Sequence, residues 1–389
     1  MARRDGRYLR RMKRYPAYDP PEYLEWEADP DENQRFRAPY ADPDRGPVLQ
    51  ALHPERLLEL YRELLRTRLH DIGLKRWVRT GVISKAWLGT GEEAVTVGSV
   101  SALEPERDLV SPMIRNAGAL LMMGMPVDDA FRGYLASDDS PSLGRDLHIG
   151  DLERNILQPI SHMGTNVAVV AGIALAFRIR RENRVAMTWI GDGATKTAAC
   201  HEGLTLAAAR RVPAVFVIQN NQVALGTRAT THGRGDLAAW GRAYGIESLT
   251  CDGNNVLDVH AAASLAVRRC RVGEGPVILV AETFRMGGHA THDEREARRT
   301  FPEELFHHWG RRDPVALMEE FLKSEGVEEE TLREIEARVT SEVDNAADVA
   351  LESRDRSPTP DGALYAGFSE GFPTIGLQKR PPGVEWTYE

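Results

Sequence analysis

The sequence predicts an α/β fold, a doubly wound parallel sheet with helices on both faces, with an extended N-terminal arm and a C-terminal tail. Three short apolar runs alternate with helical stretches: 185–190 (VAMTWI), 212–218 (VPAVFVI) and 276–281 (PVILVA). Near-continuous apolar runs separated by helices are typical of parallel strands that are covered on both faces. The chain has 389 residues, of which 42% are hydrophobic, so it is large enough to bury a substantial core.

The two ends of the chain differ from its middle. Residues 1–50 are rich in Pro, Asp, Arg and Tyr and show no helical or strand period, so we expect an extended arm there. Residues 51–345 form the expected α/β domain, whose last part, beyond about Glu303, is acidic and helical. Residues 346–389 form the expected tail, because Gly and Pro interrupt the chain after residue 361.

Two helices can be placed from the pattern of apolar residues. A helix is expected from Pro54, since leucines and a tyrosine recur on one face and charges on the other. A second helix, between the first two apolar runs, is expected to begin near Thr197 and to end at Arg210 and Arg211. It would connect two neighbouring parallel strands.

Composition excludes several classes of protein. The formal net charge of −9 is spread along the chain, which predicts no nucleic-acid partner. The basic stretch from Arg3 to Arg14 is interpreted as a solvated arm, with a targeting or nucleic-acid role as the alternative.

Cysteine usage and hydropathy point to a compartment. The three cysteines are odd in number and lack the spacing of metal ligands. Free cysteines of this kind are compatible with a reducing cytoplasm. No apolar stretch reaches the roughly 18 residues that span a bilayer. We therefore expect a cytoplasmic protein that is neither secreted nor inserted in a membrane.

Polar residues follow two of the predicted strands. Gly191-Asp192-Gly193 comes after the first strand, and Gln219-Asn220-Asn221 comes after the second. The interval between Asp192 and Asn221 fits one turn, one helix and one strand, so both side chains should reach the carboxyl edge of the sheet, where ligands bind in such folds. Magnesium prefers oxygen ligands shared with phosphates, and flanking glycines allow close approach of a diphosphate. The pattern predicts a magnesium-diphosphate site.

Two other interpretations of these segments remain. Each motif taken alone is also typical of a tight turn. The segment 191–197 (GDGATKT) could also be a phosphate loop of a nucleotide hydrolase, but that motif requires Gly immediately before Lys, where this chain has Thr195.

Together the motifs resemble a known family, the alpha subunits of the thiamin-diphosphate-dependent 2-oxo acid dehydrogenases, over about Leu57 to Val343. The segments that carry the resemblance occur in the family's order: 91–98 (GEEAVTVG), 115–118 (RNAG), 161–166 (SHMGTN), GDG with Asn-Asn, and 283–293 (TFRMGGHATHD). The resemblance implies the thiamin-diphosphate-binding fold, with thiamin diphosphate and Mg²⁺ as cofactors.

The resemblance also implies roles for individual residues. Asp192, the side chain of Asn221 and the carbonyl of Val223 would hold the magnesium ion. Arg115, Arg285 and His289 would surround the diphosphate and the catalytic carbon. Ser161 and Met163 would contact the aminopyrimidine, with Leu225 beneath the bent cofactor. The complete expected cofactor-binding set is Arg115, Ser161, Met163, Gly191, Asp192, Gly193, Ala194, Asn221, Val223, Leu225, Arg285 and His289.

His289 is the expected catalytic residue, because an imidazole titrates near neutrality and lies here in a Gly-rich loop. A solvent-exposed loop histidine is the alternative. His289, His292 and Asp293 could also form a transition-metal cluster, although the sequence shows no clear further ligand. His148 and His162 are weaker candidates for substrate contact.

The chain departs from the family pattern at several positions. Ile114 stands where a Tyr is usual, Gln219 where an Arg or Glu is common, and Val223 where a Tyr is frequent. We expect the change at Gln219 to remove a charge beside the phosphates. Ala290 replaces a phosphorylatable Ser of animal relatives. Ile160 and Asn166 put the family's potassium site in doubt.

The resemblance implies partners and a reaction. The carboxylate that protonates the aminopyrimidine would come from a beta subunit, in a two-alpha, two-beta heterotetramer, and the acyl group would pass to a lipoyl-bearing acyltransferase. The expected reaction is oxidative decarboxylation of a small 2-oxo acid, with branched-chain acids slightly favoured over pyruvate. An acetoin-type dehydrogenase and a non-catalytic scaffold of the same fold are the alternatives.

Overall fold

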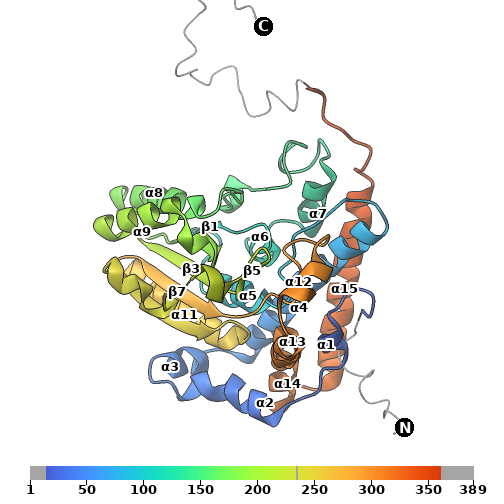
Figure 1. Cartoon of the computed structure of the whole chain (residues 1–389), viewed down its shortest axis with the longest axis horizontal. Helices are drawn as coiled ribbons and strands as arrows, with labels where there is room; N and C mark the ends of the chain where they lie inside the picture. The colour runs from blue at the N-terminus through green and yellow to red at the C-terminus, as the bar shows by residue number, and fades with distance from the viewer. Residues whose placement is uncertain (1–14, 234, 361–389) are drawn as a thin grey trace, which may run out of the picture.

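A five-stranded sheet, all of whose strand pairs are parallel, forms the centre of the molecule (Figure 1). The computed structural model describes residues 15–233 and 235–360. In their order across the sheet the strands are β1 (Leu109–Ser111), β2 (Ala186–Gly191), β3 (Ala214–Asn220), β7 (Val277–Glu282) and β6 (Glu247–Asp252). The three apolar runs of the sequence are β2, β3 and β7, as predicted. The two edge strands, β1 and β6, were not predicted.

The sheet is covered on both faces because successive side chains of a strand point to opposite sides. In β3, Val215 and Val217 pack in one core with the helices of one face, whereas Ala214, Phe216 and Ile218 pack in a second core with those of the other. Figure 1 shows the two layers. The first core includes α4 (Pro54–Arg79), α5 (Glu93–Val100) and α11 (Val256–Arg271), and the second includes α8 (Thr165–Ile179) and α9 (Ala198–Arg210). The doubly wound architecture is confirmed.

The helix between β2 and β3 has the ends that its sequence indicated. The hydroxyl of Thr197 accepts a hydrogen bond from the backbone N–H of Cys200 (3.4 Å), which caps the start of α9. The helix ends at Arg210, and Arg211 adopts the left-handed conformation with φ of 45°. The helix predicted from Pro54 is α4, with proline in its first turn, where the missing N–H costs nothing.

The remaining elements surround this core. They are α6 (Ala117–Met122), α7 (Val127–Leu135), η3 (Leu152–Arg154), η4 (Ala194–Lys196), β4 (Val223–Ala224), β5 (Thr227–Arg228), α10 (Ala229–His232), η5 (Leu237–Ala243), α12 (Glu294–Thr300), α13 (Glu303–Gly310), α14 (Pro314–Ser324) and α15 (Glu329–Leu351). The last helix continues past residue 346, the expected start of the tail, and residues 361–389 lie outside the described part. Within that part no helix has the length and apolar character needed to cross a bilayer.

The N-terminal arm contains short helices that its sequence pattern did not predict. They are α1 (Pro21–Leu24), α2 (Pro30–Arg37), η2 (Ala38–Ala41) and α3 (Arg45–Gln50). These helices are too short to show a period, and local signals start them: the Asp29 carboxylate accepts from the N–H of Asp31 (2.9 Å) ahead of α2. The basic stretch from Arg3 to Arg14 lies outside the described residues.

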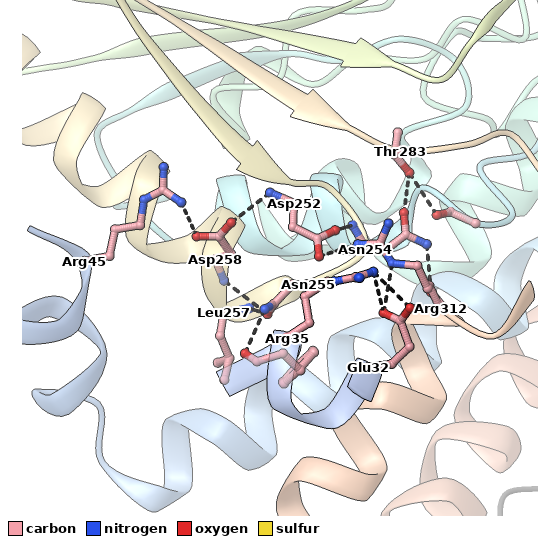
Figure 2. Close-up of polar contacts among 12 residues, drawn as sticks. Glu32, Arg35, Arg45, Asp252, Asn254, Asn255, Leu257, Asp258, Thr283 and Arg312 are labelled. Carbon is pink, nitrogen blue, oxygen red and sulfur yellow. Dashed lines mark hydrogen bonds and ion pairs between the residues drawn. The ribbon is translucent and has the colours of Figure 1, made fainter. Parts of the chain in front are cut away.

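The arm is fastened to the carboxyl end of β6 by charged groups (Figure 2). Arg312 forms ion pairs with Glu32 of α2 (3.3 Å) and with Asp252 at the end of β6. Arg45 of α3 pairs with Asp258 of α11, at 2.5 Å. The Asn255 side chain, which caps α11, also donates to the backbone carbonyl of Phe36 (2.8 Å). The arm is therefore an integral layer of the fold.

A buried cation joins the arm to the helical core. Arg68 of α4 is 3% exposed and pairs with Glu93 (2.5 Å) and Asp313 (3.0 Å). Its guanidinium also lies over the ring of Tyr23 from α1, 4.7 Å from the ring centroid. Both carboxylates are fully buried, so losing this guanidinium would leave each with less compensation for its charge.

We expect Arg68→Met to lower the free energy of unfolding by about 3–5 kcal/mol, because two carboxylates lose their buried partner. Urea denaturation of the purified protein measures this change. Arg62→Met is the matched control on the same helix: its guanidinium is 45% exposed and pairs with Glu63 and Glu342. The control should lose less than about 1 kcal/mol. Equal losses in the two variants would contradict the role given to Arg68.

Candidate functional site

Asp192 and Asn221 lie at the same edge of the sheet. Asp192 directly follows β2, and Asn221 directly follows β3. The two strands are paired, with Gly191 opposite Gln219. Both side chains are buried, at 3% and 4% exposure. The topology thus places a carboxylate and an amide at the carboxyl ends of adjacent strands, where the sequence predicted them.

The loop after β3 carries two further expected site residues. The backbone N–H of Val223 donates to Oδ1 of Asn221 (3.3 Å), so the amide also shapes the turn. Leu225 has a positive φ of 52° and a side chain that is 62% exposed. This loop lies close to the one after β2, because a Cβ added to Gly193 would be 2.5 Å from the Cβ of Ala224. Only glycine fits at position 193.

Three cationic or basic side chains gather beside these loops. Nη2 of Arg115 lies 3.2 Å from Nδ1 of His289, and Arg285 donates to the backbone carbonyl of Leu225 (2.7 Å). Burial and the charge of Arg115 lower the pKa of Arg285 to about 10. Burial, Arg115 and Arg285 lower the pKa of His289 to about 4. The structure therefore brings together the three residues expected around the diphosphate.

Glu92 joins the two groups, and the sequence interpretation assigned it no role. Its Oε1 accepts from Nδ2 of Asn221 (2.9 Å), and its Oε2 accepts from Nη1 of Arg115 (3.3 Å). The residue is 1% exposed. Glu92 lies within the segment 91–98 that carries the family resemblance, so the sequence could have drawn attention to it. Its contacts with Asn221 and Arg115 could not be predicted from the sequence.

His232 is a second unforeseen neighbour. Its Nε2 lies 3.1 Å from Oδ2 of Asp192. Burial raises the pKa of Asp192, and the interaction with His232 opposes that rise. The two side chains line a cavity of about 210 Å³ together with Lys196 and Glu282. There is room beside the Asp192 carboxylate for a ligand.

Ser161 and Met163 occupy an exposed loop before α8. The Ser161 hydroxyl lies 3.3 Å from Nε2 of His148, whose Nδ1 lies 2.8 Å from the Asp146 carboxylate. Met163 is 55% exposed, and His162 is exposed as well. The structure thus joins Ser161 to His148, and the contact of Ser161 and Met163 with an aminopyrimidine stays a prediction.

Gln219, the residue of β3 that pairs with Gly191, is a neutral side chain in the interior. It is fully buried, and its Oε1 accepts from Nδ2 of Asn116 (3.0 Å), which also donates to Thr96 (2.7 Å). The expectation that this position removes a charge beside the phosphates stays a prediction. A neutral amide suits such a place, because an unpaired charge would be costly there.

The histidine loop does not form a transition-metal cluster. His292 is exposed, and the Asp293 carboxylate accepts from the N–H of Ala290 (3.0 Å). Across residues 15–233 and 235–360, no three side chains of His, Cys, Asp or Glu are arranged to hold a metal ion.

Comparisons with known proteins show which family this chain resembles. The family model described as "Dehydrogenase E1 component" matches residues 61–359. The chain is 32% identical over 337 residues to the pyruvate dehydrogenase E1 component subunit alpha of Zymomonas mobilis, covering 84% of this chain and 93% of that protein. It is 31% identical over 337 residues to the human mitochondrial 2-oxoisovalerate dehydrogenase subunit alpha, covering 85% of this chain and 73% of that protein.

A third relative is the pyruvate dehydrogenase E1 component subunit alpha of Acholeplasma laidlawii, 33% identical over 297 residues that cover 76% of this chain and 83% of that protein. The family model and these relatives each span most of the chain, including all of the segments that carry the resemblance. The chain therefore belongs to the dehydrogenase E1 component family.

Proposed function

We propose that this chain is the alpha subunit of a 2-oxo acid dehydrogenase that carries out thiamin-diphosphate-dependent oxidative decarboxylation and passes the acyl group to a lipoyl group. One observation carries the proposal: Asp192 and Asn221 end adjacent strands beside the buried pair Arg115 and Arg285. This arrangement combines oxygen ligands for a cation with positive charge for a diphosphate.

The residues present suit magnesium and a diphosphate. Asp192 and Asn221 supply a carboxylate and an amide oxygen, and the carbonyl of Val223 would be the third protein ligand, as magnesium prefers oxygen. Arg115 lowers the pKa of Arg285, so a dianion beside them would relieve their mutual repulsion. At Gly193 the two loops leave no room for a Cβ. Gly191, Gly193 and Ala194 would then contact the diphosphate through their backbone.

The cofactor, when bound, supplies a thiazolium carbon that acts as nucleophile and electron sink. His289 is neutral near pH 7, because its pKa is about 4. Since Arg115 donates to Nδ1, the neutral imidazole carries its proton on Nε2. His289 would thus offer an N–H donor to an oxygen of the substrate, while Arg115 fixes the direction of the ring.

The proposed assembly includes a beta subunit in a two-alpha, two-beta heterotetramer, and a lipoyl-bearing acyltransferase. The exposed side chains of Met163 and Leu225 support a partner surface next to the site. Cys200, Cys251 and Cys270 are free and buried, which supports a reducing cytoplasm as the location. We favour branched-chain 2-oxo acids slightly over pyruvate, on the resemblance of the segment 287–294 (GGHATHDE) to the branched-chain type.

Calorimetric titration tests the cofactor site. Thiamin diphosphate is titrated into the chain co-purified with its beta subunit, with and without Mg²⁺. Binding should require Mg²⁺, and Asp192→Ala should weaken it by more than about 100-fold, because even partners of metal ligands contribute roughly 10–100-fold. Asp31→Ala, a change at an exposed residue of α2, is the control. Equal binding by the Asp192 variant would reject the metal site.

A substrate series tests the reaction. The same complex is given 2-oxoisovalerate, pyruvate and acetoin, and product formation is followed with an artificial electron acceptor. We expect the highest kcat/KM for 2-oxoisovalerate, by roughly 10-fold or more, the scale that one or two methylenes provide in a pocket. Turnover of acetoin alone would replace the proposed substrate class, and cofactor binding without any turnover would favour a scaffold.

The protonation of His289 provides a further test. Without cofactor its pKa should be about 4, so the imidazole stays neutral down to that pH. A bound diphosphate would offset the charges of Arg115 and Arg285, which favours the protonated form and raises the pKa. Hydrogen–deuterium exchange at the imidazole carbon, read by mass spectrometry, measures both values. A pKa near 6.5 before binding, or a fall on binding, would contradict this electrostatic picture.

A further inference from the structure

We propose that Glu92 is a positioning residue of the cofactor site, which orients the amide of Asn221 toward the metal and offsets the charge of Arg115. The inference rests on the proposed function, because it concerns the same magnesium-diphosphate site. Glu92 itself would contact neither the magnesium ion nor the diphosphate. It acts through Asn221 and Arg115, which would contact them.

The first part follows from the asymmetry of an amide group. Asn221 has one donor end and one acceptor end, and the structure assigns the donor end to Glu92 through the 2.9 Å bond from Nδ2 to Oε1. Oδ1 is then directed toward the turn, where it accepts from Val223 and keeps a lone pair for a cation. Without Glu92, either end of the amide could face the metal, and a cation binds only the oxygen.

The second part concerns charge. The second oxygen of Glu92 accepts from Arg115 (3.3 Å), the guanidinium that also contacts His289. Arg115 lowers the pKa of the nearby Arg285, whereas Glu92 raises it. One carboxylate therefore reduces the positive potential that two buried arginines create for an anion. It should weaken binding of an anion that arrives without a metal.

Glu92 is held rigidly enough for this role. It precedes α5, and its backbone N–H donates to the carbonyl of Gly89 (2.8 Å). The next residue, Glu93, accepts from the N–H of Gly91 (2.9 Å) and pairs with the buried Arg68. Gly91 has φ of 95°, and a Cβ there would lie 2.7 Å from the carbonyl oxygen of Phe284. Consecutive glutamates thus point to the site and to the core.

The two parts predict opposite changes in one variant. In Glu92→Ala, the Mg²⁺ concentration needed for half-maximal binding of thiamin diphosphate should rise roughly 10-fold, the usual loss when a partner of a metal ligand is removed. The same variant should bind inorganic pyrophosphate without metal more tightly than the wild type. Glu92→Gln keeps an acceptor for Asn221 but carries no charge. It should therefore need the same Mg²⁺ concentration as the wild type for half-maximal binding of thiamin diphosphate, while it still binds pyrophosphate more tightly than the wild type does.

Calorimetry on the complex of both subunits measures all of these quantities, with Glu106→Ala, at an exposed glutamate, as the control. If both Glu92 variants bound thiamin diphosphate and pyrophosphate more weakly than the wild type, the role of Glu92 would be merely structural and the proposal would be overturned. Binding of both molecules as in the wild type, in both variants, would overturn it as well. Failure of the proposed function is distinguishable: the wild-type complex itself would then bind thiamin diphosphate without dependence on Mg²⁺ or on Asp192.

Discussion

The buried ion pair between Arg68 and Glu93 is the interaction on which the rest of the structure depends. It joins α4 to the start of α5, and through Asp313 and Tyr23 it includes the segment before α14 and the N-terminal arm. A buried charge needs such compensation, and four elements meet at this point to provide it. The start of α5 is thereby held in place, and with it Glu92, which contacts Asn221 and Arg115.

The site combines a rigid edge with strained connections. Asp192 and Asn221 follow strands that are buried on both faces, which leaves their backbone little freedom. The loop that follows contains two residues with positive φ, Gln222 at 71° and Leu225 at 52°. Residues other than glycine rarely adopt a positive φ unless the surrounding structure holds them there. Such residues concentrate at functional sites. Here the strained turn brings Leu225 to the surface beside Arg285.

The sequence predicted the parts of the fold that have a strong local signal. The strands β2, β3 and β7 are apolar over most of their length, because each has a core on both sides, and they were predicted. The edge strand β6 is partly exposed and includes Asp252, while β1 has only three residues, so neither has such a signal. In the same way, Asp192 and Asn221 follow recognisable strands, whereas Glu92 and His232 reach the site through contacts 129 and 40 residues away in sequence. The bond between Gln219 and Asn116 was not foreseen either, because a motif does not tell which face of a strand end a side chain takes.

The docking of the arm has a consequence for how the protein folds during its synthesis. Trp26 donates to the carbonyl of Arg311, 285 residues later, and Arg68 pairs with Asp313, 245 residues later. A ribosome makes the arm before the segment that it docks on, so the arm must wait for these contacts while the residues between are synthesised. Contacts of such long range also slow folding, since a large loop must close before they form. The arm is therefore expected to dock late in folding, although it is synthesised well before the residues that bind it.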